Sequence, residues 1–223
     1  MITFRELPHA ELRPIDDALM DGNQMRLLPA SKLREFTQDE LAVWAHIRSR
    51  YGLVTKELVE FLRSNVLGRD PFDYQGIALE IGSGMGDLAF HLELRATDSA
   101  IQTSAEMRLY YEALRQPIID PPAWVERLDA VEAVKKYKPK IVIASWCTQL
   151  FREGDTEKKI GSSIHGIDEE WLLERVDVYV HIGNDSPHGT KRINRRKHEV
   201  IREPWLVSRA ADQSLNCIRI WRK

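Results

Sequence analysis

The feature that most constrains this chain is a glycine-rich turn that directly follows a short apolar run. Residues 79–87 read Leu-Glu-Ile-Gly-Ser-Gly-Met-Gly-Asp, and the apolar run before the first glycine is typical of a strand buried in a sheet. Three glycines within five residues let the backbone turn sharply and let a ligand contact the main chain. The segment therefore predicts a strand, a ligand-binding turn and a helix, the first unit of an open α/β sheet.

After this turn the chain continues to alternate short apolar runs with amphipathic stretches. Such alternation is typical of a mostly parallel sheet covered by helices. We predict strands at residues 77–81, 95–98, 124–128, 141–145, 176–182, 204–207 and 216–221, and helices at 85–92, 103–114, 131–137 and 171–175. The last two strands are expected to form an antiparallel hairpin across residues 210–213.

The beginning of the chain has a different pattern, because residues 1–67 read as helical and contain no convincing strand. Thr37 and Glu40 have the spacing of a capping box before one apolar-periodic segment. Thr55 is placed to cap a second helix. This part of the chain therefore predicts a helical extension of the α/β sheet.

A turn-rich join at residues 68–76 separates the two patterns. We expect a helical extension or lid over residues 1–75 and a cofactor-binding domain over residues 76–223. The extension is expected to cover the acceptor side of the site, where the candidate contacts are Trp44, His46, Arg50 and Tyr51.

The glycine turn differs from two well-known phosphate-binding loops. In the dinucleotide fingerprint G-x-G-x-x-G, a third glycine would stand where this chain has Asp87. A Walker loop is excluded because no Lys-Ser/Thr pair follows. The carboxylates of Glu80 and Asp87 are expected to oppose a pyrophosphate and to favour a cationic or zwitterionic ligand.

The segment from Glu80 to Gly86 resembles the E/D-x-G-x-G-x-G first motif of class I S-adenosylmethionine-dependent methyltransferases. The resemblance covers residues 77–221. It implies a Rossmann-like class I methyltransferase fold, with a seven-stranded mixed sheet, flanking helices and the N-terminal helical extension. It also implies S-adenosyl-L-methionine as the cofactor and methyl transfer to an O or N acceptor, with a small molecule favoured. The cofactor is a sulfonium cation with an amino-acid tail, which suits acidic surroundings.

The resemblance implies further cofactor contacts at the ends of neighbouring strands. Asp98 ends the second strand, where the family places an acidic residue on the ribose hydroxyls. Asp129 ends the third strand, where the family often has an acidic residue near the adenine. An aromatic face at Trp146 is expected near the sulfonium. The full set of expected cofactor contacts is Glu80, Gly82, Ser83, Gly84, Gly86, Asp98, Ser99, Asp129, Ala130, Ser145 and Trp146.

The end of the fourth strand gives little information about the methyl acceptor. Family members that methylate exocyclic amines of bases have D/N/S-P-P-Y/F/W there, but Ser145 is followed by Trp146 and Cys147 without either proline. A cytosine carbon-5 nucleophile would need a proline before Cys147. No acidic residue follows this strand to bind a metal, so we expect no metal ion.

One histidine is the predicted catalytic residue. His188 lies in a polar loop after the fifth strand, on the side where open α/β sheets bind ligands, and it is a candidate general base. His181 lies within the predicted strand, where packing is the more common role, and His165 in the loop 161–166 is a weaker candidate.

A basic segment near the C-terminus leaves a second partner open. Residues 191–202 carry six basic residues against Glu199, and they are compatible either with a nucleic-acid contact or with a solvated helix face. The basic residues are Lys191, Arg192, Arg195, Arg196, Lys197 and Arg202. The alternatives to a small-molecule methyltransferase are therefore a nucleic-acid methyltransferase, an NAD-dependent oxidoreductase and a non-catalytic cofactor-binding module.

The overall composition narrows the class of protein. Thirty-two Lys and Arg against 34 Asp and Glu give a net charge of −2, which excludes a globally basic nucleic-acid binder. Two cysteines cannot form a disulfide framework, and the N-terminal residues show no apolar signal segment, so a cytoplasmic location is expected. No apolar run approaches the ~20 residues of a membrane span, so no membrane partner is expected.

Overall fold

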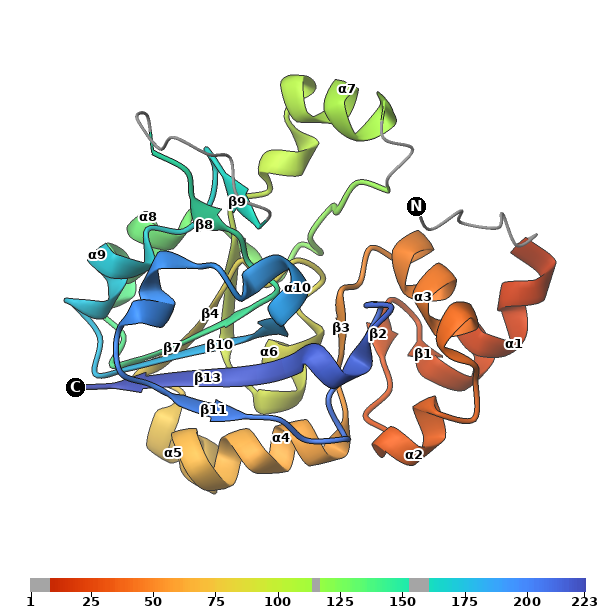
Figure 1. Ribbon diagram of the computed structural model, residues 1–223, viewed down its shortest axis with the longest axis horizontal. Coiled ribbons are helices and arrows are strands. Elements are labelled where there is room, and N and C mark those ends of the chain that lie inside the picture. The colour runs from red at the N-terminus through yellow and green to blue at the C-terminus, as the bar shows by residue number, and fades with distance from the viewer. Residues whose placement is uncertain (1–8, 114–116, 153–160) are drawn as a thin grey trace.

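A mixed β-sheet forms the centre of the molecule (Figure 1). The computed structural model describes residues 9–113, 117–152 and 161–223, and within them seven strands form this main sheet. In spatial order the strands are β11 (Glu199–Ile201), β13 (Asn216–Arg222), β10 (Val178–Asn184), β7 (Ile141–Ser145), β4 (Ala78–Ile81), β5 (Arg95–Asp98) and β6 (Glu126–Arg127). The predicted α/β architecture with a seven-stranded mixed sheet is confirmed.

Five of the strands are parallel, and the chain reverses its direction of growth in the middle of the sheet. From β4 the chain adds β5 and β6 on one side, and then crosses back to add β7 and β10 on the other side. The strand β13 is antiparallel to both of its neighbours, β10 and β11. Because the loops after β4 and β7 diverge, a crevice forms at the carboxyl ends of these strands, where open sheets bind ligands.

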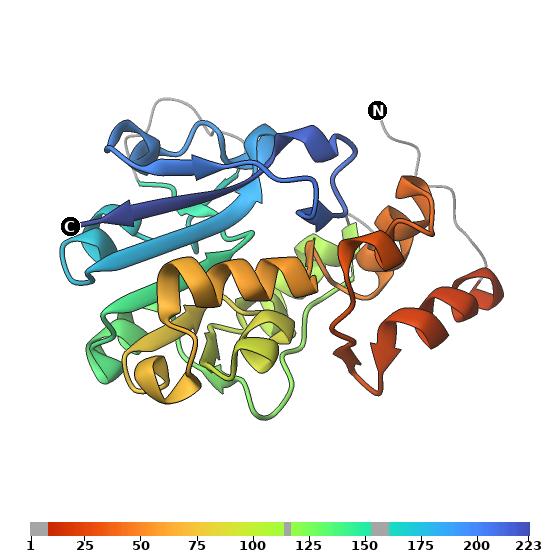
Figure 2. The ribbon, with the colours of Figure 1, turned by 90° about the horizontal axis from the view of Figure 1, so that it is seen from below.

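Helices cover both faces of the main sheet. One layer contains α4 (Lys56–Leu62), α5 (Pro71–Tyr74) and α6 (Asp87–Leu92), and Figure 2 shows α4 on the face seen from below. The opposite layer contains α8 (Ala130–Tyr137) and α9 (Glu169–Leu173). Along β7, Ile143 joins the first layer's core, whereas Val142 and Ala144 join the second, as the two-residue period of a strand requires.

The residues before α4 form a unit with its own core, which we call the N-terminal unit (residues 9–53). It contains α1 (His9–Leu19), a hairpin of β1 (Met20–Asp21) and β2 (Gln24–Met25), α2 (Ala30–Leu33), α3 (Gln38–Ile47) and β3 (Gly52–Leu53). Leu33, Leu41 and Trp44 are buried at its centre. Figure 1 shows this unit beside the main sheet, at the end where β4 and β10 terminate.

The helix starts expected from the sequence are present. Thr37 and Glu40 form the reciprocal capping box at the start of α3. The hydroxyl of Thr55 accepts a hydrogen bond from the amide of Leu58 at 3.1 Å and caps α4. The helix expected at 103–114 is α7 (Ala105–Ala113), and residue 114 lies outside the described residues. These ends were predictable because capping is local chemistry.

Three strand predictions are wrong. The N-terminal residues do contain strands, namely β1, β2 and β3. The sixth main-sheet strand is β11, a few residues before the predicted 204–207, and the predicted hairpin across 210–213 does not form. Instead β12 (Val207–Ser208) pairs with β3. The apolar residues near 206 are buried against the N-terminal unit, whereas the edge strand β11 is mostly exposed and lacks an apolar signal.

No helix among the described residues is long and apolar enough to cross a membrane.

Candidate active site

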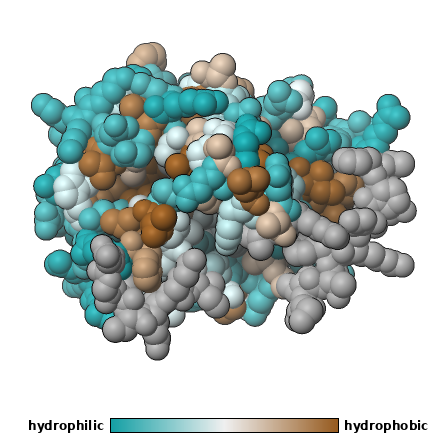
Figure 3. Space-filling model, turned by 90° about the horizontal axis from the view of Figure 1, so that it is seen from above, coloured by the Kyte–Doolittle hydropathy of each residue, from teal (hydrophilic) through white to brown (hydrophobic). Residues whose placement is uncertain are grey.

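A cavity of about 750 Å³ opens at the carboxyl ends of β4, β5 and β7. Its walls come from the glycine turn, the start of α8, the loop before α9, the helix α7 and residues 49–54 of the chain. Seen from above, apolar side chains gather in a hollow on this face of the molecule (Figure 3). The volume lies within the range of ~300–1,000 Å³ that is usual for small-molecule sites. The cavity is therefore the candidate site, at the place that the reversal of strand order predicts.

The three glycines of the turn have different roles, although all three have left-handed φ angles between +55° and +75°. A Cβ atom on Gly82 would lie 2.5 Å from Cys147 Sγ, and one on Gly86 would run into the ring of Trp124. At Gly84 the nearest atom would be 3.6 Å away. Packing therefore requires glycine at the two outer positions, and Trp124 keeps Gly86 out of the cavity lining.

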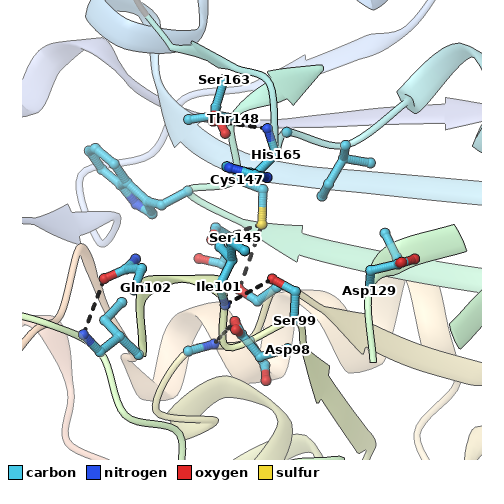
Figure 4. A pocket seen from close by; sticks show the side chains of 18 of the residues that line it. Asp98, Ser99, Ile101, Gln102, Asp129, Ser145, Cys147, Thr148, Ser163 and His165 are labelled. Atoms are coloured by element: carbon cyan, nitrogen blue, oxygen red, sulfur yellow. Dashed lines mark hydrogen bonds between the residues drawn. The ribbon is translucent and has the colours of Figure 1, made fainter. Parts of the chain in front are cut away.

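Asp98 connects the glycine turn to the end of β5. Its Oδ2 accepts a hydrogen bond from the amide of Gly84 at 2.9 Å, and its Oδ1 accepts one from the amide of Ala100 at 2.7 Å. Figure 4 shows Asp98 beside Ser99 at the cavity, and both residues line it. Each carboxylate oxygen has a second lone pair, so Asp98 can still accept hydrogen bonds from two ligand hydroxyls.

Asp129 is both a helix cap and a cavity residue. Its Oδ1 accepts a hydrogen bond from the amide of Glu132 at 2.8 Å, which caps α8. No hydrogen bond from the described residues reaches its Oδ2. Asp129 and Ala130 both line the cavity, on the side away from the N-terminal unit's Tyr51. The position therefore offers one free acceptor atom to a ligand.

Trp146 turns the chain sharply at the end of β7. Its φ of 59° is left-handed, which is uncommon for a bulky residue and clusters at functional sites. Its amide donates to the carbonyl of Ile182 at 2.8 Å, which holds this conformation. Its ring lies 6.1 Å from that of Tyr51 and 5.4 Å from that of His188, centroid to centroid. Trp146 and Ser145 line the cavity, as expected.

Two carboxylates that were expected to repel a phosphate carry little net charge in the fold. Burial raises the pKa of Glu80 to about 8, so its side chain is mostly protonated at neutral pH. The carboxylate of Asp87 is buried and pairs with the guanidinium of Arg50 at 2.7 Å. Asp87 also accepts hydrogen bonds from the Gln24 side chain and the Met25 amide. The charge argument drawn from the sequence is therefore wrong for both residues.

Backbone geometry replaces that argument. The amides of Ser83, Gly84 and Gly86 already donate to Thr97 O, Asp98 Oδ2 and Ser83 O. The amide of Ala89, in the first turn of α6, donates to Glu80 Oε2 at 2.7 Å. A pyrophosphate needs free amides at such a turn and at the following helix N-terminus. The turn thus has few donors to offer to a phosphate group.

The predicted catalytic histidine is not brought into the cavity. His188 ends α10 (Asp185–His188), is 2% exposed and is absent from the cavity lining. Its Nδ1 accepts a hydrogen bond from the amide of Asn184 at 3.2 Å, and burial next to Lys191 lowers its pKa to about 3. His181 is buried beside it, and burial lowers the pKa of His181 well below its ordinary value. The catalytic role of His188 stays a prediction without support from its position.

The thiol of Cys147 lines the cavity but is not activated. Its Sγ lies 3.6 Å from the carbonyl oxygens of Ile81 and Gly82. Burial raises its pKa to about 12, whereas a nucleophilic cysteine needs a lowered pKa. Within the described residues, no group of three or more His, Cys, Asp or Glu side chains is placed to hold a metal ion.

The basic segment 191–202 does not form one surface. Lys191 is buried and its ammonium bonds to Glu169 at 2.7 Å, so the prediction that it contacts nucleic acid is wrong. Arg192 donates to the carbonyl of Leu150, and Arg202 pairs with Asp185. The remaining members are exposed, and they are Arg195, Arg196 and Lys197.

The N-terminal unit supplies part of the cavity wall. Of its four candidate contacts, Arg50 and Tyr51 line the cavity, whereas Trp44 is buried in the unit's own core and His46 is not among the lining residues. The sequence reading missed the contacts from α7 and from the residues that follow it, namely Met107, Tyr111 and Ile119. Their apolar spacing was interpreted as ordinary helix packing, yet α7 buries none of its residues.

No protein-family model matches the chain, and no curated protein matches it in sequence.

Proposed function

We propose that the protein is an S-adenosylmethionine-dependent methyltransferase that transfers a methyl group to an O or N atom of a small acceptor. The observation that carries the proposal is the position of Asp98. Its carboxylate lies at the carboxyl end of the strand next to β4, bonds to Gly84 in the glycine turn and retains free lone pairs toward the cavity. A nucleoside ribose presents two adjacent hydroxyls, which one carboxylate can accept.

The charges of the cavity favour a cationic cofactor. Asp98, Asp129 and Glu132 line it and have no ion-pair partner among the described residues. The cofactor supplies a methyl group on a positively charged sulfur. An aromatic face also attracts a cation, and Trp146 provides one at the end of β7. The acidic side of the cavity and this ring therefore fit a sulfonium-bearing nucleoside.

The amides of the turn distinguish this cofactor from a dinucleotide. Ser83, Gly84 and Gly86 use their amides inside the protein, and no Lys or Arg in the cavity lining is free of a carboxylate partner, because Arg50 pairs with Asp87 and Arg127 with Asp120. A pyrophosphate would therefore meet few donors and no unpaired cation. The cavity suits a ligand without phosphate better.

Calorimetric titration with S-adenosylmethionine, S-adenosylhomocysteine and NAD tests the proposal. We expect micromolar binding of the first two. The variant Asp98→Asn retains the size of the side chain but loses one acceptor oxygen, so binding should weaken about tenfold to a hundredfold, the effect of losing a charged hydrogen bond.

A matched control is Asp70→Asn, because Asp70 also bonds a backbone amide, that of Phe72 at 3.0 Å, but caps α5 outside the cavity. This control should bind like the wild type. Binding of NAD without binding of S-adenosylmethionine would overturn the proposal and make the turn a dinucleotide site, since Glu80 and Asp87 place no net charge against a phosphate.

A further inference from the structure

One part of the cavity carries no charge. Tyr51 lines it from the N-terminal unit, Tyr111 and Met107 from α7, Ile119 from the segment after α7, and Trp146 from the end of β7. None of these residues is charged, and burial raises the pKa of Tyr111 to about 12, which keeps its hydroxyl protonated. The side chains around this part of the cavity are therefore suited to a neutral, flat ligand.

The aromatic wall is held firmly in place. The guanidinium of Arg209 lies 3.5 Å from the centroid of the Tyr51 ring and covers one of its faces. The amide of Arg209 donates to the carbonyl of Tyr51 at 2.9 Å. Gly52 allows Trp146 to approach, because a Cβ there would lie 2.8 Å from the indole Nε1. Rigid aromatic side chains bind flat ligands at little cost in conformational entropy.

His165 lies on the opposite side of the cavity from the cofactor contacts. Figure 4 shows it with Thr148 above Cys147, whereas Asp98 and Ser99 lie below. It is the one histidine among the described residues that lines the cavity, and its ring is exposed. No hydrogen bond from the described residues reaches this ring, so its nitrogen atoms are available to a ligand.

The backbone around His165 is fixed by short contacts. The amide of His165 donates to Ser163 Oγ at 3.1 Å, and the amide of Ile167 donates to the carbonyl of Thr148 at 2.9 Å. A Cβ on Gly166 would run into the carbonyl of Gln149, so the two backbones touch there. This packing places the His165 side chain at a defined position on the wall.

We propose that the methyl acceptor is a small neutral phenol whose ring packs against Tyr51 and Trp146 and whose hydroxyl proton passes to His165. This inference rests on the proposed function. The phenol oxygen forms a bond to the methyl carbon while the carbon–sulfur bond breaks, and the sulfur keeps that electron pair as a neutral thioether. The O–H bond breaks, its electron pair stays on oxygen, and the proton goes to a ring nitrogen of His165, from which water removes it.

The test compares two phenols with tritiated S-adenosylmethionine at pH 8. The hydroxyl of 4-methylphenol is almost fully protonated at this pH and needs a base, whereas 4-nitrophenol is already ionised. His165→Gln should slow methylation of 4-methylphenol by about 10²-fold to 10⁴-fold, the usual contribution of a general base. Methylation of 4-nitrophenol should change by less than about threefold, because no proton remains to be transferred.

The control is His198→Gln, because His198 stacks on Trp221 away from the cavity. It should methylate both phenols like the wild type. An equal loss for both phenols in His165→Gln, or no loss for either, would overturn the role of His165. Unchanged thermal unfolding of His165→Gln, or of His165→Asn as a second variant, shows that the loss is not one of folding.

A readout without turnover completes the test. With S-adenosylhomocysteine bound, 4-methylphenol should slow the modification of His165 by diethylpyrocarbonate, mapped by mass spectrometry, and should leave His198 unaffected. Binding of S-adenosylhomocysteine without protection of His165 and without methylation of either phenol would overturn the acceptor class and leave the proposed cofactor standing. Failure of S-adenosylmethionine and S-adenosylhomocysteine to bind would overturn the proposed function itself.

Discussion

The main sheet and the N-terminal unit reach the same cavity by different means. The sheet side depends on backbone geometry, since the glycine turn, Asp98 and Trp146 are placed by strand ends and left-handed residues. The N-terminal unit depends on side chains, above all on the buried ion pair between its Arg50 and Asp87 of α6. One region thus carries a site in its fold, and the other is positioned by a few specific contacts.

This difference teaches where the cavity is vulnerable. The sheet's elements share an extensive core with the helices on both faces. The N-terminal unit has a separate core, and its connections to the rest include the Arg50 pair, the pairing of β3 with β12 and the side chain of Gln38 on Ser208 and Ala210. Changes at these connections should open the cavity wall before the sheet unfolds.

The largest expected effect comes from breaking the ion pair. Arg50→Leu leaves the Asp87 carboxylate buried without its cation, which should lower the free energy of unfolding by about 3–5 kcal/mol. Urea denaturation measures this change. In the double variant Arg50→Leu/Asp87→Leu, the loss should be clearly smaller than the sum of the two single losses. Additive losses would mean that the pair does not join the two regions.

The glycine turn should show that its positions have separate roles. Gly86→Ala places a Cβ against Trp124 in a left-handed conformation, so it should lose about 3 kcal/mol of stability from strain and overpacking together. Gly84→Ala has the strain alone, about 1–2 kcal/mol, but its Cβ points into open space beside the cavity. Thermal unfolding and calorimetry separate the two effects.

We expect Gly84→Ala to lose cofactor binding more strongly than its stability change explains, and Gly86→Ala to lose mainly stability. The reverse order would show that Gly86 and not Gly84 faces the ligand, in conflict with the position of Trp124.

The buried Glu80 should give stability a pH dependence. Its pKa is about 4.5 in the unfolded chain and about 8 in the fold, because burial disfavours its charged form. Between these values the folded state holds a proton that the unfolded state has lost, so stability falls as pH rises, by up to about 1.4 kcal/mol per pH unit. Above pH 8 the effect ends.

Glu80→Gln should remove this slope, so that the variant gains on the wild type between pH 5 and pH 8. Urea denaturation at a series of pH values measures it. Parallel pH profiles for the two proteins would show that Glu80 is ionised in the fold and would restore its charge to the cavity.

The smallest effect is expected on the exposed basic residues. Charge reversal at Arg195 and Arg196 should change the unfolding free energy by less than about 0.5 kcal/mol and leave cofactor binding unchanged, because both side chains are exposed and outside the cavity. Fluorescence anisotropy with labelled RNA and duplex DNA at physiological salt completes the comparison. Specific binding in the wild type that the reversal abolishes would favour a nucleic-acid acceptor over a small one.

Predictability from the sequence follows the range of the interactions. The strand at 141–145, the cap at Thr37 and the turn at 82–86 were read correctly because an apolar run, a cap and a glycine cluster each act within a few residues. The edge strand β11 was misplaced, since its exposed residues give no apolar pattern. The pairing of β12 with β3 joins residues about 150 positions apart and leaves no local signal.

The candidate site divides in the same way. Residue type and order alone determined the glycine turn, the acidic residues at the ends of β5 and β6, and the aromatic residue after β7, because strand ends of a parallel sheet meet at one edge. Only the tertiary structure decided the charge states of Glu80 and Asp87, the burial of His188 and Lys191, and the exposure of His165 to the cavity. These properties depend on desolvation and on partners distant in sequence, and neither is written in the residues nearby.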